Sequence, residues 1–397
     1  MIKYLGSKRN LVPALGTIAQ AAQAKTALDL FSGTTRVAQE FKRRGIFTTA
    51  TDLASYSYQL ARTYIETDSD LVDYDSLQQH LTTMSALKGK EGYFTETFCR
   101  QARFFQPANG MRIDACRDYL MDLEDSPLFP ILLTSLIEAA DRVDSTTGVQ
   151  MAYLKQWAAR SYNPLELRIP QLLSGKGQAL QGDALKLVNQ VAPVDLAYLD
   201  PPYNQHRYFT NYHIWETLVR WDAPQTYGVA CKRIDARGDE HRSVFNSKRT
   251  MATSFFSLLA QVKAKTLVVS YNDEAWINED EMISAIKEAG FAQVKKFGFS
   301  QRRYVGAKIG IYNSRGKKVG KTVMSNKRYE VNTPGVSPVD RDVTKLLYVS
   351  TAKYGGDWHS LMHTHACTEL FYVVGGMGQF KVAEKLIPVS PDDLVIV

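Results

Sequence analysis

Four short segments of this 397-residue chain read as strands that each end at or beside an aspartate. Helical patterns separate these segments, and a further strand and helix follow near residues 266–289. Strands that alternate with helices favour a mostly parallel sheet, whose ligand crevice lies at the carboxyl ends of the strands. We therefore predict an α/β fold in which four carboxylates meet at one sheet edge: Asp29, Asp52, Asp183 and Asp200.

The first two of these strands form a predicted βαβ unit. Between them lie a turn that contains Phe31, Ser32 and Gly33, and then a helix. Asp52 follows Asp29 by 23 positions, a spacing at which an acid binds ribose hydroxyls in nucleotide-binding α/β folds. The turn is not GxGxxG, which disfavours a dinucleotide and allows a nucleoside cofactor without phosphates. An α/β unit that binds no ligand is the alternative.

The last of the four strands, Val194–Leu199, runs directly into Asp200-Pro201-Pro202-Tyr203. Proline donates no backbone N–H and holds the chain extended, so the preceding carbonyls stay free to accept hydrogen bonds. Together with the carboxylate and the ring, these carbonyls could grip an exocyclic amine and stack on its heterocycle. The alternative is a strand that ends in a proline turn, with the aspartate as a turn residue.

Two stretches interrupt the alternation. Residues 56–172 have helical patterns and no evident parallel strand, which predicts an inserted helical domain that either reads a substrate or serves as a structural lid. Residues 225–249 read as a polar loop. Residues 211–213, before this loop, are candidates either for a pocket wall or for a structural role.

The basic character of the chain is local. The formal net charge is +7, yet residues 291–321 alone hold nine lysines and arginines and no acid. A second basic turn, between Tyr4 and Lys8, opens the chain. A solvated basic tail is the alternative for the longer run, but beside a base-gripping motif we favour binding to nucleic acid.

Cysteine usage and hydropathy bear on location. The four cysteines lie far apart without a CxxC pair, which fits unpaired thiols in a reducing cytosol. No apolar run reaches the length of about 18 residues that a membrane helix needs, and no signal-peptide pattern opens the chain. We expect a cytoplasmic protein without membrane contact.

Residues 1 to about 320 resemble the D12 class of N6-adenine DNA methyltransferases. The matching pieces, in the family's order, are the Tyr4–Lys8 turn, Asp29 to Gly33, Asp52, the helical insert, Gly182-Asp183 and Asp200-Pro201-Pro202-Tyr203. An insert before the catalytic motif resembles the alpha arrangement, in which the insert is the target-recognition domain. The resemblance thus implies a Rossmann-like catalytic domain at residues 1–55 and 173–322, and a target-recognition domain at 56–172.

The resemblance also implies site residues and ligands. The S-adenosylmethionine cofactor would have its methionine side lined by Tyr4, Lys8, Asp29, Phe31, Ser32 and Gly33, its ribose held by Asp52 and its adenine by Asp183. Asp200, Pro201, Pro202 and Tyr203 would form the catalytic motif, which needs no metal. Double-stranded DNA is the expected substrate, and a cognate restriction endonuclease is a candidate partner. Methylation of cytosine N4, and a catalytically silent DNA-binding or cupin-type regulator, are the alternatives.

The C-terminal part has a different pattern. Residues 323–339 read as a linker, and residues 340–397 resemble the first half of a cupin barrel, as found in sugar-sensing transcription regulators. The spacing of His363, His365, Glu369 and Gly376 fits the first cupin motif. A half-barrel has open edges and little core. We interpret this small β segment as an appendage that arose by fusion or at a gene boundary, without a role in methylation.

Overall fold

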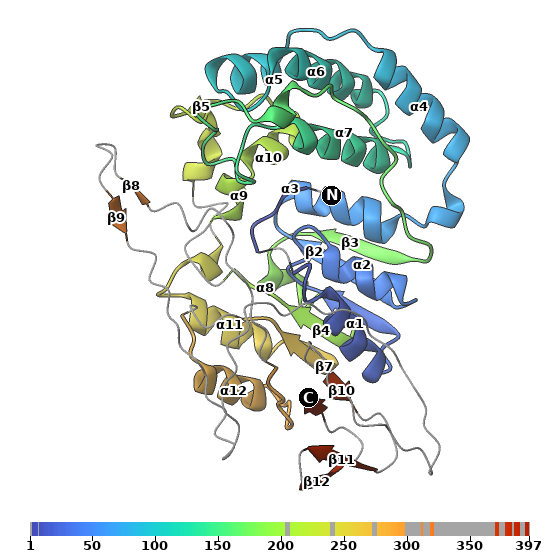
Figure 1. Ribbon diagram of the computed structural model, residues 1–397, viewed down its shortest axis with the longest axis vertical. Coiled ribbons are helices and arrows are strands. Elements are labelled where there is room, and N and C mark those ends of the chain that lie inside the picture. The colour runs from blue at the N-terminus through green and yellow to red at the C-terminus, as the bar shows by residue number, and fades with distance from the viewer. Residues whose placement is uncertain are drawn as a thin grey trace. The chain divides into compact units, whose positions relative to one another are not determined.

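The computed structural model describes residues 2–6, 8–202, 207–238, 243–271 and 276–297, and the backbone of six later short strands. The chain divides into two compact units, Met1–Lys295 and Lys296–Val397. Figure 1 labels their elements.

The first unit is built on a five-stranded parallel sheet (Figure 1). Its strands are β1 (Thr26–Asp29), β2 (Phe47–Asp52), β3 (Gly177–Gln181), β4 (Val194–Leu199) and β7 (Ala264–Val269), in the order β3-β2-β1-β4-β7. Every neighbouring pair is parallel. The predicted α/β fold is therefore confirmed. From β1 the chain adds β2 and β3 on one side, and then β4 and β7 on the other. The strand order thus reverses between β1 and β4, and ligands bind at such a point in folds of this kind.

Helices cover both faces of the sheet, because successive side chains of a strand point to opposite faces. Leu196 and Tyr198 of β4 pack in one buried cluster with α1 (Val12–Ala21) and α2 (Arg36–Arg43). Ala197 and Leu199 pack in another with α8 (Ala184–Leu187), α11 (Met251–Leu259) and α12 (Glu279–Glu288). The strand is thus buried on both sides from Leu196 to Leu199, as this apolar run requires.

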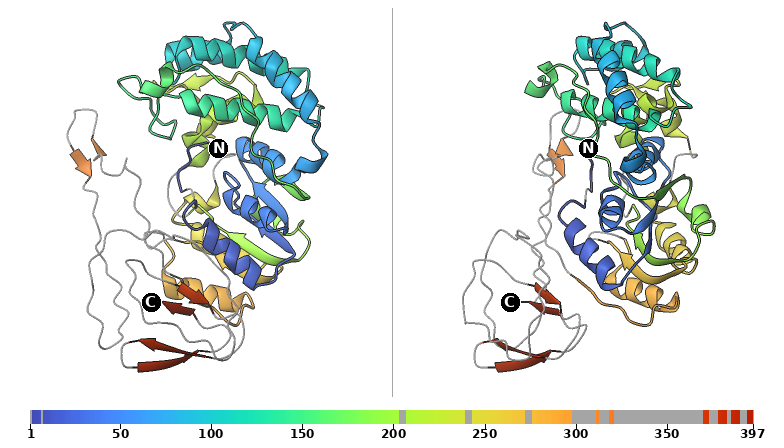
Figure 2. Two further views of the ribbon diagram at one scale, coloured as in Figure 1. Left: turned by 45° about the vertical axis from the view of Figure 1, so that its right-hand side comes forward. Right: turned by 90° about the vertical axis from the view of Figure 1, so that its right-hand side faces the viewer.

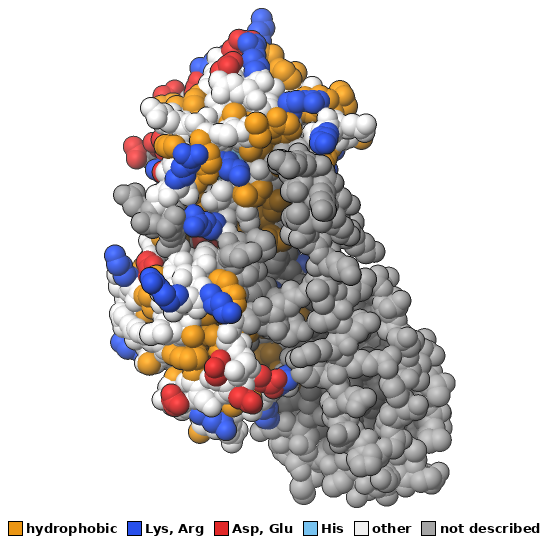
Figure 3. All heavy atoms as spheres, turned by 90° about the vertical axis from the view of Figure 1, so that its left-hand side faces the viewer, with side chains coloured by type: hydrophobic (Ala, Val, Ile, Leu, Met, Phe, Trp, Pro, Cys, Tyr) orange, Lys and Arg blue, Asp and Glu red, His pale blue; other side chains and the backbone are white. Residues whose placement is uncertain are grey.

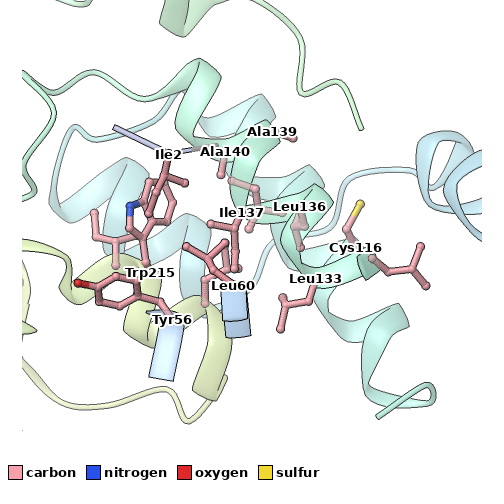
Figure 4. Close-up of a cluster of buried hydrophobic side chains, with 14 of the residues drawn as sticks. Ile2, Tyr56, Leu60, Cys116, Leu133, Leu136, Ile137, Ala139, Ala140 and Trp215 are labelled. Carbon is pink, nitrogen blue, oxygen red and sulfur yellow. The ribbon is translucent and has the colours of Figure 1, made fainter. Parts of the chain in front are cut away.

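Between β2 and β3 the chain is helical, as predicted. It forms α3 (Ser55–Ala61), α4 (Tyr74–Ala86), α5 (Tyr93–Thr95), α6 (Pro107–Met121) and α7 (Phe129–Val143). Short turns of other helix types lie at η1 (Arg62–Glu66), η2 (Ser69–Leu71), η3 (Glu96–Gln101) and η4 (Ala159–Tyr162), and residues 53–176 contain no strand. Apolar side chains of α7, including Leu133, Leu136 and Ile137, belong to one buried cluster with Trp215 and Ile2 (Figure 4). The insert therefore shares one buried cluster with segments far from it in sequence.

The helices α9 (Tyr208–Asn211) and α10 (His213–Arg220) follow β4. The next stretch, residues 225–249, differs from the prediction of a polar loop. It contains a hairpin of β5 (Thr226–Tyr227) and β6 (Lys232–Arg233), and the short helices η5 (Ile234–Arg237) and η6 (Val244–Asn246). The physical reason is that Arg233 is buried at 1% exposure and pairs with Asp222 and Asp235. Polar residues thus order this segment through internal ion pairs.

In the second unit, the described backbone consists of three antiparallel pairs: β8 (Ile311–Tyr312) with β9 (Lys318–Gly320), β10 (Leu370–Tyr372) with β13 (Leu394–Ile396), and β11 (Gly378–Val382) with β12 (Lys385–Val389). Figure 2 shows these strands in two further views. His363, His365 and Glu369 lie outside the described residues, and the cupin resemblance stays a prediction. Within the described ranges, no helix has both the length and the apolar sequence needed to cross a membrane.

Candidate active site

A single cavity gathers the predicted site residues at the carboxyl ends of β1, β2 and β4. It encloses about 1170 Å³ of empty space, which includes open solvent at its mouth. Its lining includes Tyr4, Lys8, Asp29, Phe31, Ser32, Gly33, Asp52, Asp183, Asp200, Pro201 and Pro202. Tyr203 lies outside the described residues. The four predicted acids therefore do meet at one edge.

The turn after β1 is shaped by Gly33 and Asp52. Gly33 has φ +50°, and a Cβ on it would lie 3.1 Å from Cε1 of Tyr4. Its N–H donates to Oδ2 of Asp52 at 2.8 Å, and Oδ1 of Asp52 accepts from the Ala54 N–H at 3.0 Å. Burial raises the pKa of the Asp52 carboxyl, and these N–H donors oppose that shift. Each oxygen keeps a second lone pair that can accept a ligand hydroxyl.

Asp29 carries an unfilled acceptor. Its Oδ2 accepts from the Ala38 N–H at 3.1 Å, whereas its buried Oδ1 has no hydrogen-bond partner among the described residues. Burial, and next the negative charge of Asp200, raise the pKa of the Asp29 carboxyl to about 8. A cationic ligand in the cavity would reverse this shift, because it stabilises the ionised form.

Asp200 is held by the N-terminal segment. Lys8 Nζ lies 2.7 Å from Asp200 Oδ2, with both side chains largely buried. Burial raises the pKa of the Asp200 carboxyl, while the Lys8 ammonium lowers it. Oδ1 of Asp200 is buried and has no hydrogen-bond partner in the described part of the chain. The ion pair thus favours the carboxylate and leaves one oxygen to accept from a ligand.

Asp183 has a structural hydrogen bond as well as a place in the lining. It precedes the short helix α8, and its Oδ1 accepts from the Leu185 N–H at 2.8 Å. The side chain is partly exposed to the cavity, so its other oxygen is available to an amine donor.

Aromatic residues complete the walls, and sequence reasoning missed most of them. The ring of Tyr4 stacks on those of Tyr208 and Tyr212, with centroid distances of 5.3 and 4.8 Å. Phe245 meets Phe31 edge to face at 5.3 Å. Tyr208, Phe209, Ser243, Phe245 and Asn246 line the cavity from the segment after β4. The sequence signal that could have identified these wall residues is the aromatic pair at 208–209, which lies shortly after the proline motif.

The candidate wall residues Asn211, Tyr212 and His213 have structural contacts instead. The Gln150 N–H donates to the carbonyl of Asn211 at 2.8 Å, and the carbonyl of Gln150 lies 3.0 Å from Nε2 of His213. Tyr212 accepts from the Leu5 N–H through its hydroxyl. All three residues are buried, and none of them lines the cavity. Of the two roles that were open for them, the contacts therefore favour the structural one.

The N-terminal segment also contacts the helical insert. Lys3 Nζ lies 3.0 Å from Asp141 Oδ2 and 3.2 Å from Asp144 Oδ1, at the end of α7. Asp144 also accepts from Arg160. Residues 2–8 therefore bind the insert at one end and Asp200 at the other.

Comparison with known proteins extends this description. The family model for D12 class N6 adenine-specific DNA methyltransferase matches residues 4–285. The chain is 28% identical over 337 residues to "Type II methyltransferase M.NlaIII" of Neisseria lactamica, a match that covers 81% of this chain and 97% of that one.

Two longer proteins are also similar. "Modification methylase StsI" of Streptococcus sanguinis is 26% identical over 99% of this chain, and "Type II methyltransferase M.FokI" of Planomicrobium okeanokoites is 27% identical over 76% of it. The matched parts span 59% and 50% of those relatives. No solved structure matches the chain.

Proposed function

Because this chain belongs to the D12 class of N6 adenine-specific DNA methyltransferases, we propose that it transfers a methyl group from S-adenosylmethionine to N6 of an adenine flipped out of double-stranded DNA. The observation that carries this proposal is a pair of carboxylates at the ends of adjacent strands: Asp29 is the last residue of β1 and is buried, and the largely buried Asp200 directly follows β4. Each has one oxygen without a hydrogen-bond partner in the described part of the chain, and both line one cavity.

The chemistry of the cavity suits this cofactor. When bound, S-adenosylmethionine supplies an electrophilic methyl group on a positively charged sulfur. Four aspartates and two cationic side chains, Lys8 and Arg36, line the cavity, so acids outnumber bases and the lining favours a cation. Tyr4, Asp29 and the turn from Phe31 to Gly33 would hold the methionine side.

The remaining cofactor contacts follow the strand order. Asp52 would accept from the ribose hydroxyls, and Asp183 from the adenine amine. The Gly33 N–H already binds Asp52, and a Cβ at Gly33 would lie only 3.1 Å from the Tyr4 ring, so the turn is packed without any ligand. Such preorganisation reduces the cost of binding.

Asp200 and Pro201 would prepare the amine of the target base. That amine is a poor nucleophile because its lone pair is conjugated into the ring. Oδ1 of Asp200 can accept one N6–H and the Pro201 carbonyl the other, which localises the lone pair on nitrogen. The proton that N6 loses passes to Asp200 or to water. Most of the rate enhancement would come from holding the amine in line with the methyl group.

Tyr203 and Pro202 complete the catalytic motif in this proposal. Tyr203 would stack on the base, which must leave the duplex to reach the cavity. The helical insert, at residues 56–172, would read the target sequence. A cognate restriction endonuclease is a candidate partner, since relatives are named type II methyltransferases, and we propose the cytoplasm as the location.

The decisive experiment uses labelled S-adenosylmethionine and DNA of mixed sequence, followed by digestion to nucleosides. Label in N6-methyladenine supports the proposal. Label in N4-methylcytosine would replace it with the cytosine reaction, and no transfer by a protein that binds the cofactor would refute enzymatic activity. Asp200→Ala is the control, because it should abolish transfer while cofactor binding persists.

A further inference from the structure

A cationic side chain in the active-site cavity has a donor without a partner. Arg36, the first residue of α2, lines the cavity together with the aspartates and Lys8. Lys8 is bound to Asp200 at 2.7 Å. The Nε of Arg36, by contrast, is buried and has no hydrogen-bond partner among the described residues. Buried polar atoms are normally hydrogen-bonded, so this exception indicates a partner that is not part of the chain.

The charges around Arg36 favour an anion as that partner. Burial, and next the positive charge of Arg9, lower the pKa of the Arg36 guanidinium, while the smaller effects of Tyr64 and Glu138 oppose this shift. Tyr64 already donates its hydroxyl to Glu138. A guanidinium stays protonated in proteins, so Arg36 keeps a positive charge in the cavity, and an anion beside it would be stabilised.

The backbone before Arg36 is held in an unusual conformation. Thr35 has φ +61°, in the left-handed region that β-branched residues rarely adopt. Its N–H donates to the Ser32 carbonyl at 2.6 Å, and its carbonyl accepts from the Gln39 N–H at 2.8 Å. Gln39 Nε2 also donates to Oγ1 of Thr35 at 2.8 Å. Strained residues that several contacts hold in place cluster at ligand sites. These bonds fix the backbone from which the Arg36 side chain extends.

An acid on the same strand–turn–helix unit complements Arg36. Two residues after Arg36, the Ala38 N–H donates to Oδ2 of Asp29 at 3.1 Å, and Oδ1 of Asp29 has no partner in the described part of the chain. The unit thus presents a free acceptor and a free donor, of opposite charge, to one cavity. An α-amino acid group carries an ammonium and a carboxylate on the same carbon, which matches this pair of charges.

A phosphate of the DNA backbone is the other anion that an arginine could bind. Phosphates lie on the outside of a duplex, where exposed cations reach them. Figure 3 shows such lysine and arginine side chains spread over the described surface of one face. Arg36 differs from them because it lines the cavity and is only partly exposed. Its position therefore favours an anion that belongs to a ligand of the cavity.

We propose that the Arg36 guanidinium binds the carboxylate of the cofactor's methionine part, and that Arg36 thereby selects S-adenosylmethionine over nucleosides that lack this group. This inference rests on the proposed function for the identity of the cofactor. A guanidinium can form two parallel N–H···O bonds to a carboxylate, which a lysine cannot. Lys8 stays with Asp200 in this arrangement.

The test measures ligand binding and does not depend on methylation. Calorimetry compares S-adenosylhomocysteine with its decarboxylated analogue, which keeps the amine and lacks the carboxylate. The parent protein should bind S-adenosylhomocysteine about ten- to a hundredfold more tightly, as expected for hydrogen bonds between charged groups. Arg36→Met should remove most of this preference by weakening the binding of S-adenosylhomocysteine alone, and Arg36→Lys should restore part of it.

Arg43→Met is the matched control. Arg43 lies on the same helix, is about half exposed, and pairs with Glu40 at 2.6 Å without lining the cavity. This variant should bind both ligands as the parent does. Unchanged binding of the decarboxylated analogue to Arg36→Met shows at the same time that this variant is folded.

The remaining outcomes would overturn the assignment in distinct ways. An equal loss for both ligands in Arg36→Met would mean that Arg36 shapes the cavity without contacting the carboxylate. Parental binding of both ligands, with weaker DNA binding and a shallower salt dependence, would assign Arg36 to a DNA phosphate. A parent that binds neither ligand would refute the cofactor itself. If the parent shows the expected preference but methylates no adenine, only the proposed function fails.

Discussion

Lys8 Nζ and Asp200 Oδ2 lie 2.7 Å apart, although 192 positions separate the two residues. This ion pair joins the basic turn at the start of the chain to the proline motif after β4. It matters because burial alone raises the pKa of the Asp200 carboxyl, and a protonated acid is a weaker acceptor that could not take the proton from the amine. The lysine that sequence similarity assigns to the cofactor is thus also a partner of the catalytic carboxylate.

Replacing Lys8 should change the pH dependence of methylation. In Lys8→Met the pKa of Asp200 rises, because the opposing positive charge is lost; such a charge is worth about 1–3 pKa units. The acidic limb of the kcat profile should therefore move to higher pH by about 1–3 units. Lys8→Arg retains the charge and should shift the limb less. If the acidic limb of the kcat profile stays in place in Lys8→Met, Lys8 does not control the ionisation of Asp200.

Asp29 should make cofactor binding pH-dependent. Its pKa in the free protein is about 8, and a cationic ligand binds the ionised carboxylate better. The affinity for S-adenosylmethionine should therefore increase on the order of tenfold between pH 6.5 and 8.5. Calorimetry in buffers of different ionisation enthalpy should detect proton release. Asp29→Asn should bind more weakly and without this slope; a parental affinity independent of pH would contradict the assignment.

The same carboxyl should influence folding stability in the opposite sense. A folded-state pKa raised above its unfolded value gives a contribution that is complete below about pH 4 and is lost as pH rises through 8. Without cofactor, the free energy of unfolding should fall by about 2 kcal/mol between pH 6 and 8.5. Denaturant titrations measure this change. In Asp29→Asn the decrease should be smaller, and an identical decrease would assign it to other groups.

Gly33 allows a matched pair of substitutions. Gly33→Ala and Gly45→Ala both place a side chain at positive φ, which costs about 1–2 kcal/mol each. A Cβ at Gly33 meets Tyr4 at 3.1 Å, whereas a Cβ at Gly45 meets no atom within 4 Å. Both variants should lose similar thermal stability, and only Gly33→Ala should also lose cofactor affinity. Equal affinities in isothermal titration would show that contact with Tyr4 does not shape the site.

The sheet and its acidic edge could be predicted because they follow from short-range patterns. Strand periodicity located the β1, β2 and β4 ends, and parallel topology then brought Asp29, Asp52 and Asp200 together. The hairpin could not be predicted in this way. Its order depends on Arg233 and the acids that bind it, and such a buried polar pairing leaves no periodic signal.

The residues that line the cavity wall could not be predicted for a related reason. The choice between residues 208–209 and 211–213 depends on which side of a short helix meets Gln150, a contact made across more than 60 positions. The packing of Ile2 and Trp215 with the helical insert is equally non-local. The sequence patterns therefore left open the roles of those residues whose positions depend on contacts with residues far away in the sequence.

The salt bridges of Lys3 have a consequence for recombination between related enzymes. Because Lys3 binds Asp141 and Asp144 of the insert, and Lys8 five positions later binds Asp200, a foreign insert would meet an N-terminal segment shaped for another partner. Chimeras that exchange residues 56–172 alone would lose these contacts unless the donor has acids at both positions. The transferable module is therefore the insert together with residues 2–8.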